Sequence, residues 1–204
     1  MAPADSETIL DKVLEIAGDK GWTGLTMEMV AENAGVPLAD LTRAYPRKSA
    51  ILNALADRFE QLAEVATDPE ACDPSLPVPE RLFDAIMTRF ELMQEHRDGY
   101  VAIIGAARRD PCMALTGATR LQPAMGIILR QTGLEGRGLS GFLRRKVLSA
   151  LYLSVLRVWL KDESEDLGPT MAALDKRLRQ LDEIVMATPF RGKTRQKENS
   201  KAGA

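Results

Sequence analysis

The sequence contains little of the chemistry that most enzymes need. Its 204 residues include a single histidine, His96, and two cysteines, Cys72 and Cys112. The cysteines match no zinc-ligand spacing and are too few for a disulfide framework, a usage that is typical of a reducing cytosol. No Ser-His-Asp set, phosphate loop or two-histidine metal site can be assembled around His96, which a C-terminal helix cap explains. We therefore expect neither an enzyme nor a cofactor or metal site.

Long hydrophobic runs and an excess of charge are also missing. The longest apolar stretch, from Val147 to Leu160, contains polar residues and is shorter than the roughly 20 residues that cross a bilayer. The N-terminus lacks the cationic and apolar regions of a secretory signal. The formal net charge is -2, so any nucleic-acid partner has to be argued from local features. These absences indicate a cytoplasmic protein without membrane insertion.

What is present is helical periodicity together with 45% hydrophobic residues, enough for a sizeable core. The spacing predicts about nine helices and no strand. Ser6 and Thr26 are the expected N-caps of the first two helices, Gly21 ends the first, and Pro123 is expected to kink the seventh. The predicted helices span about 6–20, 26–34, 38–44, 47–66, 80–95, 99–109, 111–132, 139–161 and 170–187.

Proline density divides the chain. Four prolines lie between positions 68 and 79, a density that no helix interior tolerates, so we place the domain junction there. The predicted organisation is a helix-turn-helix domain over 1–66, a Pro-rich junction over 67–79 and a larger helical domain over 80–188. Residues 189–204 form a basic tail that we expect to be disordered, with a net charge of about +4 from Arg191 onward.

The segment from Thr26 to Tyr45 reads as a capped helix, a turn at Gly35 and a second short helix. Such a unit can place a helix in the major groove of DNA, and Gly35 supplies a turn conformation that a residue with a Cβ atom would resist. The same pattern also fits an ordinary helical hairpin. The residues expected to pack between the two helices are Leu25, Val30, Ala31, Val36, Leu41 and Tyr45.

Residues 6–66 resemble the N-terminal domain of the TetR family of transcriptional regulators. The resemblance rests on Gly21-Trp22 before the Thr-capped helix, the Ala34-Gly35-Val36 turn, and Tyr45-Pro46 followed by Lys48. It implies a TetR-like all-α fold, a third helix in the major groove and phosphate contacts at the start of the fourth helix. The implied DNA-binding residues are Thr26, Pro37, Leu38, Ala39, Asp40, Thr42, Arg43, Tyr45, Arg47 and Lys48.

The sequence departs from this family on the expected docking face. Pro37, Leu38, Ala39 and Asp40 stand where the family usually has Ser, Lys, Gly and Thr, and Thr42 replaces the usual Tyr. Residues 1–66 carry eleven carboxylates against six basic side chains, a net charge of about -5. Because Lys and Arg supply much of the affinity for DNA, we expect weak binding to double-stranded DNA.

The predicted C-terminal domain contains two helices that suit a homodimer interface. The helix over 139–161 is apolar nearly all round, and the last helix carries a seam at alternating three- and four-residue steps. The alternative is that both helices pack inside one chain. The predicted interface residues are Val147, Leu151, Val155, Trp159, Leu174, Leu178 and Leu181.

Apolar stripes on the three helices over 80–132 are candidates for the lining of a cavity. A Met-rich lining suits a small, loosely specified apolar effector, although the same residues also suit a plain core. The predicted ligand-binding residues are Phe83, Met87, Phe90, Tyr100, Ile103, Met113, Leu121, Met125 and Ile128.

Two functions fit these patterns. The first is a ligand-responsive, DNA-binding transcriptional regulator of the TetR type, usually a repressor in that family. The second is a TetR-fold auxiliary protein of ubiquinone biosynthesis that binds lipid or quinone and does not bind DNA. The segments Tyr152 to Trp159, Asp162 to Asp166 and Thr170-Met171 faintly resemble that second group, and the acidic N-terminal domain favours it.

Overall fold

The structure is a computed structural model that describes residues 3–187, with side-chain surroundings for residues 6–181. This part of the chain is all-α, as predicted, and contains nine helices and no strand. The basic tail over 189–204 lies outside the described residues. The helices are α1 (Pro3–Gly24), α2 (Met27–Ala34), α3 (Leu38–Ala44), α4 (Lys48–Ala66), α5 (Val78–Gln94), α6 (Arg97–Ala107), α7 (Pro111–Gln131), α8 (Gly138–Trp159) and α9 (Gly168–Ala187).

The local signals explain most helix ends. The Thr26 hydroxyl accepts a hydrogen bond from the Met29 amide at 3.3 Å, and Gly35, with φ of 65°, ends α2 in the left-handed region. Gly21, with φ of 74°, interrupts α1 where its end was predicted. The prediction for Ser6 is wrong, because α1 begins at Pro3 and the Ser6 hydroxyl instead bonds the Tyr45 hydroxyl at 2.8 Å.

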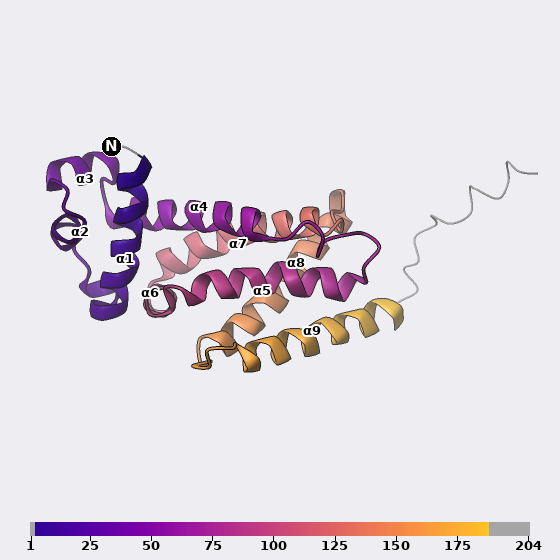
Figure 1. The fold of residues 1–204 in the computed structure, drawn as a ribbon. Coiled ribbons are helices and arrows are strands. Elements are labelled where there is room, and N and C mark those ends of the chain that lie inside the picture. Colours follow the sequence, from indigo (N-terminus) through magenta and orange to yellow (C-terminus); the bar gives the residue numbers. More distant parts are fainter. Residues whose placement is uncertain (1–2, 188–204) are drawn as a thin grey trace, which may run out of the picture.

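Two hydrophobic cores hold the described residues together. The first core is formed by α1, α2, α3 and α4 around residues such as Val13 and Leu41, which are fully buried. The second joins α5, α7, α8 and α9 around Phe90 and Trp159. Figure 1 shows α1, α2 and α3 gathered at one end, with α4 and α5 running lengthwise away from them. No described helix is both long and apolar enough to span a membrane.

Helix α6 belongs to the second predicted domain but packs on α1 of the first. Ile103 of α6 belongs to the first core, far in sequence from the other members. At Gly99 the backbones of the two helices meet so closely that a Cβ atom would lie 2.4 Å from the Leu14 carbonyl oxygen. The two predicted domains are therefore in direct contact through α1 and α6.

Candidate DNA-binding face and apolar surfaces

Helix α3 presents most of its surface to solvent. Its one fully buried residue is Leu41, which inserts into the first core and fixes α3 against α2. Leu38, Ala39 and Asp40 are exposed, and Pro37 precedes them as the N-cap residue. The helix is held from one side only, which leaves the opposite side free to dock.

The polar side chains of α3 bond to their own helix. An Arg43 guanidinium nitrogen lies 2.6 Å from a carboxylate oxygen of Asp40, one turn away. The Thr42 hydroxyl donates to the Leu38 carbonyl at 2.8 Å. Ion pairs this exposed contribute about 0–1 kcal/mol, so Arg43 can leave Asp40 at little cost. The carboxylate nevertheless offsets the charge of Arg43.

Lys48 and Arg47 differ in how far they are available to phosphate. The Lys48 ammonium donates to the Trp22 carbonyl at 2.5 Å and lies 4.9 Å from the centroid of the Trp22 ring. Partial burial lowers the pKa of Lys48 below its ordinary value. Arg47 is exposed and forms no ion pair with a described residue. Lys48 thus ties α4 to the end of α1, and Arg47 is the cation that faces solvent.

Tyr45 requires a correction as a DNA-binding candidate. Its ring is buried in the first core and its hydroxyl is bonded to Ser6. Thr26, another candidate, is exposed but its oxygen accepts the capping hydrogen bond from Met29. The residue pattern placed Tyr45 both in the core and on the docking face, and the structure supports only its place in the core.

The predicted effector cavity also requires a correction. Met87, Phe90, Met125 and Ile128 are buried and pack into the second core instead of lining an open space. Phe90 stacks on Tyr152 with 5.2 Å between ring centroids, which closes the region between α5 and α8. Phe83 and Leu121 are partly buried at the margin of the same core.

The remaining ligand candidates point toward the first domain. The Tyr100 ring meets Phe59 of α4 edge-on at 5.8 Å, and burial raises the pKa of Tyr100 to about 12. Ile103 is part of the first core, and Met113 lines a cleft beside α1. The nine predicted ligand residues therefore form no single site.

An apolar groove of about 360 Å³ lies elsewhere, between the start of α5, the ends of α7 and α9, and the first half of α8. Arg144 is its one charged lining residue, and the Arg144 guanidinium donates to the Leu134 carbonyl at 2.8 Å. Sequence periodicity missed this groove because four helices and a loop contribute to it. The lining residues are Val78, Pro79, Leu82, Leu129, Leu134, Leu143, Arg144, Val147, Leu148, Leu178 and Leu181.

Most predicted dimer residues are buried inside the chain. Leu151, Val155, Trp159, Leu174 and Leu178 belong to the second core, so they cannot meet a partner without unfolding. Leu181 is partly buried, and Val147 alone is exposed. A helix that is apolar all round does not reveal which face turns inward. The exposed apolar side chains on α8 are Leu139, Phe142, Leu143, Val147 and Leu153.

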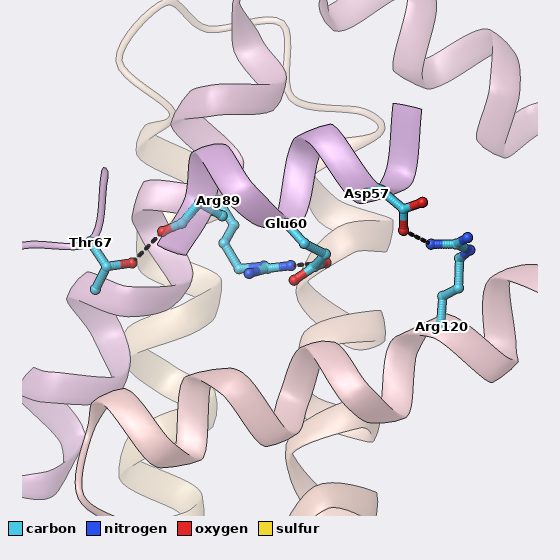
Figure 2. Close-up of polar contacts among 6 residues, drawn as sticks. Asp57, Glu60, Thr67, Arg89 and Arg120 are labelled. Atoms are coloured by element: carbon cyan, nitrogen blue, oxygen red, sulfur yellow. Dashed lines mark hydrogen bonds and ion pairs between the residues drawn. The ribbon is translucent and has the colours of Figure 1, made fainter. Parts of the chain in front are cut away.

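Ion pairs fasten α4 to the second half of the molecule (Figure 2). Asp57 lies 2.6 Å from Arg120 of α7, and Glu64 lies 3.1 Å from Arg130 of the same helix. Between them, Glu60 pairs with Arg89 of α5, which is buried and lies over the Phe59 ring. These partners are far apart in the sequence, and no local pattern predicted them. Within residues 3–187 no group of acidic, histidine or cysteine side chains is arranged to hold a metal ion.

Comparison with known proteins gives a family-model match and structural matches. The COQ9 family model matches residues 127–185, and a search of curated proteins finds no match. A TetR transcriptional regulator from Nitrosomonas europaea superposes with a TM-score of 0.74 at 18% identity, covering 89% of this chain and 99% of that one. A TetR regulator from Rhodococcus sp. RHA1 gives 0.63 at 16% identity, covering 87% and 95%.

The multidrug-binding protein EbrR, solved with malachite green, gives a TM-score of 0.61 at 18% identity, with 88% of this chain and 98% of that chain covered. These identities are low, and the COQ9 match covers α8 and α9 with only the end of α7. The solved structures and this chain have the same overall arrangement of helices. The chain therefore has the all-α TetR-like fold.

Proposed function

We propose that the protein is a ligand-responsive, DNA-binding transcriptional regulator, a repressor of the TetR type that works as a homodimer. The observation that carries this proposal is the solvent-facing α3, positioned by the Thr26-capped α2, the Gly35 turn and the buried Leu41. This is the arrangement in which a helix-turn-helix unit docks its second helix in the major groove. The TetR-like fold supports the same assignment.

The chemistry of α3 suits a small set of base contacts. Arg43 is long enough to leave Asp40 for a guanine edge, and the apolar Leu38 and Ala39 suit the methyl group of thymine. Arg47 supplies a phosphate contact at the start of α4. With few cations on this face, we expect weak binding that is easiest to detect at low salt and that varies only modestly with salt concentration. The apolar groove of α5, α7, α8 and α9 is the effector site in this proposal.

Asp40→Asn tests the docking face. We expect it to tighten binding to every DNA sequence by roughly two- to fivefold at low salt, because it removes a carboxylate near phosphate and frees Arg43. Asp175→Asn is the matched control, since Asp175 pairs with Arg179 one turn away on α9 and should leave binding unchanged. The measurement is fluorescence anisotropy with fragments selected from genomic DNA. If Asp40→Asn weakens binding to the preferred fragment alone, then Asp40 contacts a base. If the wild-type protein retains no DNA fragment even at low salt, the proposal that it is a DNA-binding regulator is refuted.

The homodimer of this proposal uses an exposed apolar row of α8 that lies outside the groove, formed by Leu139, Phe142 and Leu153. Phe142→Asp combined with Leu153→Asp places two charges on that row without touching the core, and we expect dimer to give way to monomer at micromolar concentration. Light scattering after gel filtration measures the mass. Leu115→Asp on α7, at a side chain even more exposed than Phe142 and Leu153, should leave the dimer intact. A double variant that stays dimeric would place the interface elsewhere.

A second candidate is a lipid- or quinone-binding protein that does not bind DNA. The observation that favours it is the COQ9 match, because residues 127–185 include eight of the eleven lining residues of the apolar groove, among them its one charge, Arg144. Mass spectrometry of an organic extract of the purified protein separates the two. Stoichiometric copurified lipid from a protein that retains no DNA fragment at low salt would favour this candidate.

A further inference from the structure

A cleft of about 770 Å³ lies between the two halves of the molecule, away from the apolar groove. Its walls are the end of α1, the start of α4, and the facing parts of α6 and α7. Small-molecule sites in proteins measure about 300–1,000 Å³ and combine apolar walls with a few polar groups. Trp22, Leu52 and Met113 provide the apolar wall of this cleft. Its volume and its lining therefore suit a small organic molecule.

The polar groups of the cleft favour an anion. Arg109, in the short turn after α6, is exposed there and pairs with no described carboxylate. Lys48 uses one ammonium hydrogen on the Trp22 carbonyl and has two others. The acidic lining residue, Asp110, already accepts from the Cys112 and Met113 amides as the cap of α7. The charged groups of the cleft that still have free hydrogen-bond donors are thus the cations Arg109 and Lys48.

We propose that this cleft binds a small organic anion with an aromatic or otherwise apolar body, its charge held by Arg109 and Lys48 and its body lying against Trp22 and Met113. Because Lys48 joins α4 to α1 beside the proposed docking face, an occupied cleft restrains the start of α4, which Arg47 directly precedes. Any effect of this restraint on DNA binding rests on the proposed function. The binding of the anion in the cleft does not depend on it.

The cleft contains its own reporter. Of the two cysteines, Cys72 is buried and Cys112 is exposed in the cleft wall, so a thiol reagent labels Cys112 in the folded protein. The probe is 1-anilinonaphthalene-8-sulfonate, an aromatic anion. We expect it to slow the labelling of Cys112 with saturation, whereas binding in the apolar groove would leave the labelling rate unchanged. The neutral analogue N-phenyl-1-naphthylamine should protect Cys112 about a hundredfold less effectively, because it lacks the charged group that Arg109 and Lys48 would both bind.

Arg109→Gln tests the anion site directly and should raise the half-saturating probe concentration about tenfold. Arg108→Gln is its control, because Arg108 is also exposed but does not line the cleft. Equal effects of the two substitutions, equal protection by the neutral analogue, or no protection at saturating probe would overturn the proposal. The assay contains no DNA, so it remains decisive for the cleft even if the protein retains no DNA fragment.

Discussion

Replacing Gly99 with alanine is expected to lower the free energy of unfolding by about 3 kcal/mol, a large loss for one methyl group. The added Cβ atom would lie 2.4 Å from the Leu14 carbonyl oxygen, which is backbone and cannot rotate away. Helices α1 and α6 would have to separate, and Ile103 would lose packing in the first core. Urea denaturation followed by circular dichroism measures the change.

The same helix provides the control. A Cβ atom at Gly105 would meet no atom within 4 Å, so Gly105→Ala should raise the free energy of unfolding by roughly 0.5–1 kcal/mol through helix propensity. If both substitutions stabilise the protein, then α1 and α6 are not in backbone contact. The outcome bears on function, since this contact joins the helix-turn-helix half to the rest of the chain.

Asp162→Asn is expected to cost roughly 2–4 kcal/mol at neutral pH. Asp162 is buried between α8 and α9, and its carboxylate accepts bonds from the amides and hydroxyls of both Ser164 and Thr170 at 2.5–3.1 Å. An asparagine side chain presents donors where acceptors are needed. Burial acts to raise the pKa of Asp162, but these hydrogen bonds outweigh it and the pKa lies below its ordinary value.

The direction of this pKa shift fixes the pH dependence. A lowered pKa means that the stabilisation is fully present above the unfolded value of about 3.9 and disappears as the pH falls through the folded value. The difference between wild type and Asp162→Asn should therefore be constant near neutrality and shrink below about pH 4. Asp166→Asn, which removes an exposed carboxylate bonded only to the Gly168 amide, should cost less than about 1 kcal/mol. A pH-independent difference would contradict this assignment.

The sequence predicted the local structure well and the packing less well. The span of α3 and the turn at Gly35 were predicted as found, because capping and the left-handed conformation are local properties. The inward face of α8 was not predicted, because apolar residues surround that helix and only its neighbours decide that Trp159 is buried and Phe142 exposed.

The candidate sites show the same contrast. A contiguous motif predicted Arg43, Arg47 and Lys48 as DNA contacts, and this stays a prediction, but the sequence did not show that Lys48 is bonded to the Trp22 carbonyl. The groove and the cleft each draw their walls from four helices, so no single stretch carries their pattern. The Met-rich stripes, by contrast, had a periodicity that fits a core and a cavity equally, and they form a core.

The ion pairs of α4 change how the charge of the N-terminal segment should be counted. Three of its eleven carboxylates, Asp57, Glu60 and Glu64, are matched by arginines that lie beyond residue 66. A polyanion approaching α3 therefore meets a field less negative than residues 1–66 alone would produce. If this segment were expressed alone, those carboxylates would lose their counterions, and the segment would present a more negative field to any polyanion than the full chain does.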